Sequence, residues 1–134
     1  MGSAVGPFEG PPASTLVLVD SSVWMAHERV PDPELCRLLR ASLAAGTAEV
    51  IHEICLGCGA RPLEIAADVR LLPQLPTPTE PMEARLHATD LRCRGIGIAD
   101  ARIILAALDS GARLYSKDRG MVGVAKRLGI LHEP

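Results

Sequence analysis

Four acidic residues, each in its own local context, are the part of this sequence best suited to chemistry. They are Asp20, Glu53, Asp100 and Asp118. Asp20 follows an apolar run that resembles a buried strand, and Asp100 opens a helical stretch. Asp118 ends the run Ala112-Arg113-Leu114-Tyr115-Ser116-Lys117-Asp118. Carboxylates at the C-terminal ends of parallel strands gather in one crevice of an α/β sheet. They repel each other there unless a cation lies among them, and hard oxygen ligands suit Mg²⁺ or Mn²⁺. The pattern therefore predicts metal-assisted phosphodiester chemistry.

Each of these acids also has an ordinary structural explanation. Asp20 and Asp100 stand where helices are expected to begin, and Asp is favoured there both as a cap and at the positive end of the helix dipole. Asp118 suits a turn, and Glu53 suits an exposed helix position. A cap explains one acid at a time. The occurrence of all four together favours a shared site.

The elements that position these acids alternate between strands and helices. Strands are expected at 15–20, 47–51, 113–116 and 130–132. Helices are expected around 23–27 and at 34–45, 52–58, 63–72, 81–94, 100–110 and 121–128, with Gly46 and Gly111 as stop signals. This order predicts an α/β fold, a three-layer αβα arrangement with a short central parallel sheet. Residues 1–14 are expected to be a disordered leader, and residues 15–134 a single domain.

Composition narrows the function classes further. The chain has 134 residues, of which 48% are hydrophobic and 2% aromatic, so its core is aliphatic and platforms for base stacking are scarce. The formal net charge is −2, which gives no global basic field, although twelve of the fourteen cations are Arg, a residue suited to phosphate. We find no apolar run long enough for a membrane span and no signal peptide, and the four cysteines are expected to be reduced in the cytoplasm. Cys55 and Cys58 form a single C-x-x-C, which is a weak signal for zinc.

The sequence resembles the PIN-domain ribonucleases of the VapC toxin type. The resemblance rests on four blocks in the family's order, of which the first and third are the most specific: Leu16-Val17-Leu18-Val19-Asp20-Ser21-Ser22-Val23-Trp24, Val50-Ile51-His52-Glu53-Ile54-Cys55-Leu56-Gly57, Gly95-Ile96-Gly97-Ile98-Ala99-Asp100-Ala101 and Leu114-Tyr115-Ser116-Lys117-Asp118. It extends from about residue 15 to the C-terminus. Two departures are His52, where the family often has Gly, and Ser116, where Thr is more frequent.

The resemblance implies a PIN-like fold and a Mg²⁺- or Mn²⁺-dependent endoribonuclease that cleaves cellular RNA, tRNA or rRNA above all. Asp20, Asp100 and Asp118 are then the expected metal ligands, with Glu53 completing the acidic site. Expected partners are a cognate VapB-type antitoxin and a second copy of the chain. If Glu53 is misaligned, Glu49 or Glu64 takes its place.

Several neighbouring residues have two open interpretations. Ser22 and Ser116 are expected to support the carboxylates or water on the metal. Arg92, Arg94, Lys117 and Arg119 are either solvated surface cations or contacts to the RNA backbone. Two other functions stay open: a catalytically silent PIN-fold module that binds RNA or protein, and a phosphatase or flap-type DNA nuclease that uses the same carboxylates.

Overall fold

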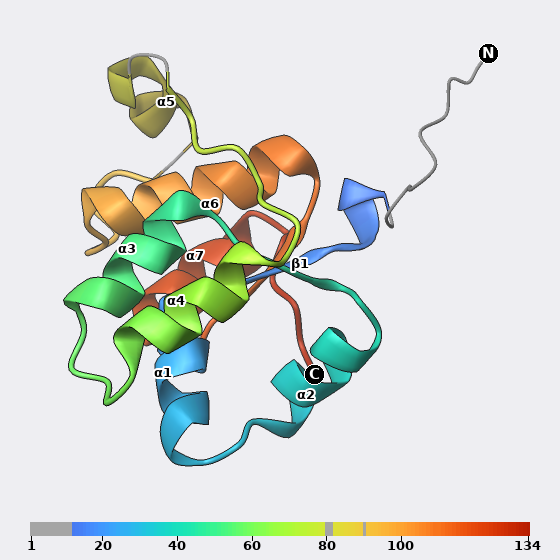
Figure 1. The fold of residues 1–134 in the computed structure, drawn as a ribbon. Helices are drawn as coiled ribbons and strands as arrows, with labels where there is room; N and C mark the ends of the chain where they lie inside the picture. Colours follow the sequence, from blue (N-terminus) through green and yellow to red (C-terminus); the bar gives the residue numbers. More distant parts are fainter. Residues whose placement is uncertain (1–11, 80–81, 90) are drawn as a thin grey trace.

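The fold is built on a short parallel sheet surrounded by helices (Figure 1). The computed structural model describes residues 12–79, 82–89 and 91–134. Its strands are β1 (Val17–Val19), β2 (Ala44–Ala45) and β3 (Arg113–Tyr115), in the order β2-β1-β3, and both pairings are parallel. The central strand β1 is buried over its whole length, as its continuous apolar sequence predicts for a parallel sheet.

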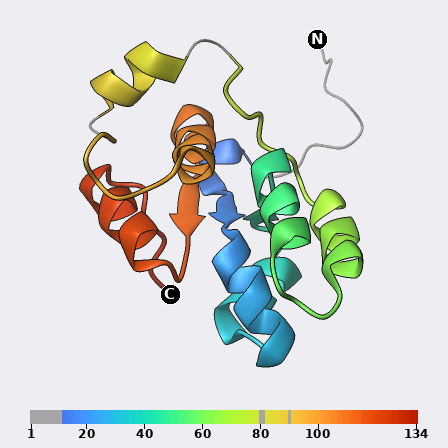
Figure 2. The same cartoon turned by 90° about the vertical axis from the view of Figure 1, so that its left-hand side faces the viewer.

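Seven α-helices and one 3₁₀ turn, Ala13–Thr15, accompany the strands in the described part of the chain. The helices are α1 (Ser21–Arg29), α2 (Pro33–Arg40), α3 (Ala48–Leu56), α4 (Pro62–Arg70), α5 (Met82–Ala88), α6 (Ile98–Ser110) and α7 (Arg119–Arg127). In Figure 2 the strands lie between α7 on one side and α3 and α4 on the other. The helix α3 packs against α1, α4 and α6, and α6 also packs against β3. The α/β architecture predicted from the alternating elements is confirmed.

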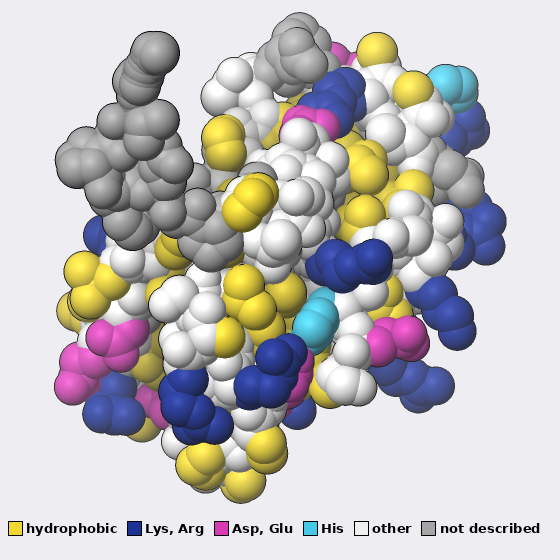
Figure 3. All heavy atoms as spheres, turned by 90° about the vertical axis from the view of Figure 1, so that its right-hand side faces the viewer, with side chains coloured by type: hydrophobic (Ala, Val, Ile, Leu, Met, Phe, Trp, Pro, Cys, Tyr) yellow, Lys and Arg dark blue, Asp and Glu magenta, His cyan; other side chains and the backbone are white. Residues whose placement is uncertain are grey.

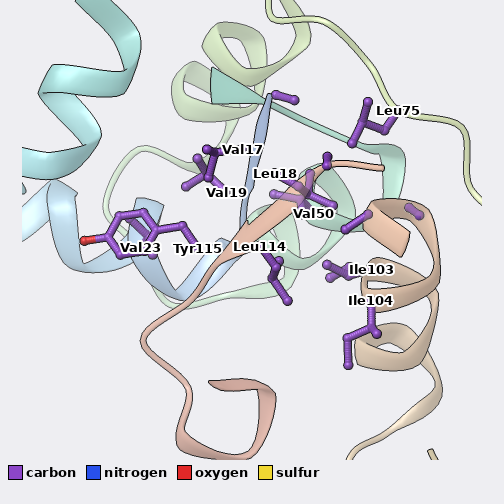
Figure 4. Close-up of a cluster of buried hydrophobic side chains, with 14 of the residues drawn as sticks. Val17, Leu18, Val19, Val23, Val50, Leu75, Ile103, Ile104, Leu114 and Tyr115 are labelled. Atoms are coloured by element: carbon purple, nitrogen blue, oxygen red, sulfur yellow. The ribbon is translucent and has the colours of Figure 1, made fainter. Parts of the chain in front are cut away.

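The core is aliphatic, as the composition predicts. Side chains of β1 and β3 meet those of α6 in a cluster that includes Leu18, Leu114, Ile103 and Ile104, all with no exposed surface (Figure 4). Tyr115 stands at the edge of this cluster, with its hydroxyl directed away from Leu114. The core therefore holds the ends of β1 and β3 side by side, and these are the ends that lead into Asp20 and Asp118.

The second helix is shorter than predicted. It was expected at 34–45 but ends at Arg40, in a Schellman motif: the N–H of Leu43 donates to the carbonyl of Leu38 at 2.9 Å, and the N–H of Ser42 donates to that of Leu39 at 3.2 Å. Ser42 takes the left-handed conformation, with φ of 59°, at the position where Gly is usual. The sequence therefore lacked the usual stop signal at this point.

Other boundaries also differ from the prediction. The strand expected at 47–51 is wrong, because those residues lie in and just before α3, and the second strand is Ala44–Ala45. The helix expected at 81–94 is only Met82–Ala88. The strand expected at 130–132 is reduced to one bridge, between Leu114 and Leu131. By contrast, Gly111 ends α6 as predicted, with φ of 72°.

The described residues contain no helix with the length and apolarity needed to cross a membrane. The predicted leader, residues 1–14, lies mostly outside the described part of the chain, and only the 3₁₀ turn overlaps its end.

Candidate active site

Asp20 is the most tightly held of the four acids. It follows β1 and precedes α1, and only 3% of its surface is exposed. Although it occupies the N-cap position of α1, its side chain makes no capping hydrogen bond. Its Oδ2 instead accepts hydrogen bonds from Ser22 Oγ at 2.7 Å and Ser116 Oγ at 2.8 Å. A helix cap therefore does not explain this carboxylate.

The hydroxyls of Ser22 and Ser116 both donate a hydrogen bond to Asp20. Ser22 Oγ and Ser116 Oγ lie 3.3 Å apart, but each hydroxyl has one proton, and both protons are needed for Asp20. Ser22 Oγ also accepts from the N–H of Lys117 at 3.0 Å, and Ser116 Oγ accepts from the N–H of Asp118 at 3.0 Å. These bonds tie the segment after β3 to the start of α1.

Glu53 reaches the same region from α3. Its Oε1 accepts a hydrogen bond from Ser21 Oγ at 2.9 Å. Of the two alternative acids, Glu49 lies 3.8 Å from Arg102, and Glu64 is an exposed residue 3.8 Å from Arg61. Among the described residues, Glu53 and neither alternative is hydrogen-bonded to Ser21, although the charge of Glu49 also contributes to the raised pKa of Glu53. Sequence reasoning missed Ser21, because two adjacent serines gave no indication of which one faces α3.

Asp100 and Asp118 also serve the helices that they begin. Asp100 lies in the first turn of α6 and is hydrogen-bonded to the backbone of Gly97, the N-cap residue. Asp118 is the N-cap of α7, where its Oδ1 accepts from the N–H of Met121 at 3.1 Å. For Asp100 the helix-start explanation is therefore correct, whereas Asp118, expected to suit a turn, is the N-cap of α7.

The charges of the four acids act on one another. Burial raises the pKa of Glu53, and the charges of Asp20 and Asp100 raise it further, against the effect of the Ser21 hydrogen bond. Burial likewise raises the pKa of Asp100, and so do the charges of Asp20 and Asp118. The fold therefore places Asp20 close enough to Glu53 and Asp100, and Asp118 close enough to Asp100, for their charges to interact. It holds them against their own repulsion, an arrangement typical of functional sites.

A divalent cation suits the chemistry of these donors, which are carboxylate oxygens with mutual repulsion to relieve. In the part of the chain that the structure describes, however, no three His, Cys, Asp or Glu side chains converge closely enough to form one ion site. The donor set fits a hydrated cation that takes one or two carboxylates directly, since Mg²⁺ keeps several of its waters. The roles of Asp20, Asp100 and Asp118 as metal ligands stay predictions.

The predicted RNA-contacting cations lie in two places. Arg92 and Arg94 line a hollow of about 310 Å³ beside the start of α6, and Arg92 Nη1 lies 3.0 Å from His87 Nδ1. Before α7, Lys117 Nζ lies 2.9 Å from Asp32 Oδ2, and Arg119 is the exposed first residue of α7. Contact of these residues with RNA stays a prediction.

The face of the molecule that includes α2 has no continuous charged field. Figure 3 shows its basic side chains scattered among apolar ones. This is consistent with the small net charge of the chain.

Comparison with known proteins identifies the family. No family model matches the sequence. The chain is 33% identical over 118 residues to Ribonuclease VapC32 of two Mycobacterium tuberculosis strains, CDC 1551 / Oshkosh and ATCC 25618 / H37Rv, in an alignment that covers 86% of this chain and 94% of the relative. The chain belongs to the VapC-type PIN-domain ribonucleases. The resemblance inferred from the four sequence blocks is confirmed at this level.

A solved structure supports the fold of this VapC-type protein. The crystal structure of PAE2754 from Pyrobaculum aerophilum superposes with a TM-score of 0.56, at 21% identity, over 92% of this chain and 88% of that one. At this identity the likeness concerns the fold alone. The VapC-type family places this chain among the ribonucleases of toxin–antitoxin systems.

Proposed function

We propose that this protein is a divalent-cation-dependent endoribonuclease that cleaves tRNA or rRNA in the cytoplasm and is neutralised by a cognate VapB-type antitoxin. The observation that carries the proposal is the state of Asp20. Its carboxylate is buried, and its Oδ2 accepts hydrogen bonds from Ser22 and Ser116. A buried carboxylate that is held in one orientation, with the charges of Glu53 and Asp100 nearby, is suited to bind a cation.

The roles of the protein groups follow from their contacts. Asp20 would hold the cation, with Asp100 and Asp118 on neighbouring helix starts contributing directly or through water. A bound divalent cation would make water a stronger nucleophile near neutral pH and offset the charge that develops on the phosphate. Ser22 and Ser116 keep Asp20 oriented, and Ser21 orients Glu53. Because its pKa is raised, Glu53 is suited to accept a proton from an attacking water.

The proposed reaction is tested by RNA cleavage. We expect the wild-type protein with Mn²⁺ to convert a tRNA pool into discrete fragments and Asp20→Asn to produce none. Asp109→Asn is the matched control, because Asp109 lies in the last turn of α6, the helix that carries Asp100 in its first turn, and pairs with Arg85 at 2.5 Å. If the folded wild type cuts neither the tRNA pool nor ribosomal RNA, the protein is a silent binding module and the proposal fails.

We propose that the antitoxin binds in a cavity between α1, α2 and α4. The cavity measures about 540 Å³. Its lining combines apolar and charged side chains: Trp24, Leu39, Ile65, Glu28, Arg61 and Asp68. The buried Trp24 Nε1 has no hydrogen-bond partner among the described residues. An amphipathic helix laid into a groove matches this mixture.

The antitoxin proposal is tested with the purified VapB-type protein. We expect it to inhibit RNA cleavage by the wild type. We expect Ile65→Glu to keep cleavage but lose the inhibition, because a charge would enter the apolar part of the cavity. The control is Leu71→Glu at the end of α4, where the side chain is 86% exposed outside the cavity. Equal inhibition of all three proteins would place the antitoxin elsewhere. The expected homodimer is checked separately by light scattering of the free protein.

A further inference from the structure

The segment Ser116–Asp118, between β3 and α7, supplies two parts of the proposed site. Ser116 provides the second hydroxyl on Asp20, and Asp118 adds a carboxylate. The N–H of Lys117 also donates to Ser22 Oγ. A small displacement of this segment would therefore alter the surroundings of Asp20 from several directions at once. Residues that fix the position of this segment are therefore expected to affect the rate of cleavage.

Asp32 contacts this segment on both sides of Ser116. It is 5% exposed and precedes α2, far from β3 in sequence. The hydroxyl of Tyr115 lies 3.1 Å from Asp32 Oδ1 and 3.0 Å from Oδ2, and Lys117 Nζ lies 2.9 Å from Oδ2. The buried carboxylate of Asp32 thus contacts both Tyr115, the residue before Ser116, and Lys117, the residue after it.

The carboxylate does more than cap a helix. Asp32 Oδ1 accepts the N–H of Leu35 at 2.9 Å, and a neutral Asn would provide that cap equally well. Burial alone would raise the pKa of Asp32, but hydrogen bonds from Leu35, Lys117 and Tyr115 together hold it below its usual value. Asp32 is therefore charged at neutral pH. A buried charge is costly to leave unpaired, so it strongly favours the one arrangement that keeps Tyr115 and Lys117 against it.

We propose that Asp32 is a positioning residue for the acidic site: by holding Tyr115 and Lys117, it keeps the hydroxyl of Ser116 on Asp20. The inference rests on the proposed nuclease function and adds to it Asp32, the N-cap residue of α2, which belongs to none of the four sequence blocks. It also gives Lys117 a different role from the predicted contact with RNA. Its ammonium group serves the internal geometry of the site.

The first test separates positioning from substrate binding. Tyr115→Phe removes only the hydroxyl, and Asp32→Asn keeps the cap while removing the charge. We expect each to lower the Mn²⁺-dependent cleavage rate at saturating tRNA about tenfold, the effect of one lost hydrogen bond to a charged group, with little change in apparent KM. Asp109→Asn is the control, because Asp109 pairs with Arg85 and, within the described part of the chain, is bonded to neither Tyr115 nor Lys117. It should leave the rate unchanged.

The second test asks whether Asp32 acts through Ser116. If it does, Tyr115→Phe has little further effect on the rate in a Ser116→Ala background. The proposal is overturned if Tyr115→Phe lowers the rate by the same factor in the Ser116→Ala background as in wild type. It is also overturned if Tyr115→Phe and Asp32→Asn leave the rate unchanged. A rise in KM alone in Lys117→Met also overturns it, because that result would assign the ammonium group to RNA.

Hydrogen exchange separates failure of this inference from failure of the nuclease proposal. The N–H groups of Lys117 and Asp118 are hydrogen-bonded to Ser22 and Ser116. We expect a peptide covering 115–118 to exchange faster in Tyr115→Phe than in wild type, whether or not the protein cleaves RNA. Unchanged exchange overturns the positioning role. If exchange is faster in Tyr115→Phe but the wild type cleaves no RNA, the positioning role of Asp32 is supported and only the nuclease proposal fails.

Discussion

Ser116 Oγ lies 2.8 Å from Asp20 Oδ2, although 96 positions separate the two residues in the chain. The contact joins the end of β1 to the end of β3, which pair in parallel with Val19 opposite Tyr115. Parallel pairing places the carboxyl ends of both strands at one edge of the sheet, so residues that follow each strand meet there. The site is thus a direct consequence of the sheet register.

Removing this hydroxyl should impair catalysis without unfolding the protein. We expect Ser116→Ala to lower the cleavage rate by about tenfold to a hundredfold, because a hydrogen bond to a charged group contributes about 1.5–3 kcal/mol. Ser116→Thr keeps the hydroxyl and should retain most of the activity. The measurement is the initial rate of RNA cleavage with Mn²⁺. Equal loss in both variants would show that the hydroxyl is not the relevant group.

Glu53→Gln should be nearly inactive yet more stable than wild type at neutral pH. Burial and the neighbouring acids raise the folded-state pKa of Glu53 above its ordinary value of 4.5. As pH rises, Glu53 therefore loses its proton in the unfolded chain before it does so in the folded protein. The free energy of unfolding falls as pH rises from the unfolded-state pKa through the folded-state pKa. The stability advantage of the variant should be present at pH 7 and disappear below the unfolded pKa. Thermal unfolding of both proteins across this range is the check, and a variant less stable at pH 7 contradicts it.

Glu34 should show the opposite pH dependence. Hydrogen bonds from Arg37 and His132 lower its pKa to about 2 from 4.5. The stabilisation from this carboxylate is complete above 4.5 and is lost as pH falls toward 2. We expect Glu34→Gln to unfold at lower urea concentration than wild type near neutral pH, with a smaller difference at about pH 3. A difference that grows on acidification would contradict the lowered pKa.

If water is the nucleophile, the 2′-hydroxyl of the RNA is not needed for cleavage. An RNA with a 2′-O-methyl group at the cleaved nucleotide should then be cut at a comparable rate, provided that the methyl group is accommodated. A 2′-deoxy substitution at the same position is the smaller control. Products with 2′,3′-cyclic phosphate ends, identified by mass spectrometry, would mean attack by the RNA itself and would contradict the mechanism.

The site was more predictable from the sequence than the element boundaries. An apolar run placed β1 and the short run at 113–116 placed β3, so Asp20 and Asp118 could be assigned to strand ends, and Gly111 gave the end of α6. The end of α2 was missed because Ser42, not Gly, adopts the left-handed conformation. The two-residue strand β2 was missed because alanines carry no strand signal and pair only with β1. Contacts over long separations, such as Tyr115 to Asp32, leave no local pattern at all.

The most direct test of the central claim measures cation binding and cleavage on the same protein. Thermal stability and the rate of tRNA-pool and total-RNA cleavage are followed as Mn²⁺ increases, for wild type and Asp20→Asn, with EDTA as the blank. A cation that binds only the folded state raises the melting temperature. We predict that stabilisation and cleavage rise with the same midpoint in wild type, and that both are lost in Asp20→Asn. Cleavage that persists in EDTA, or in Asp20→Asn at the wild-type rate, would contradict a cation-dependent nuclease centred on Asp20.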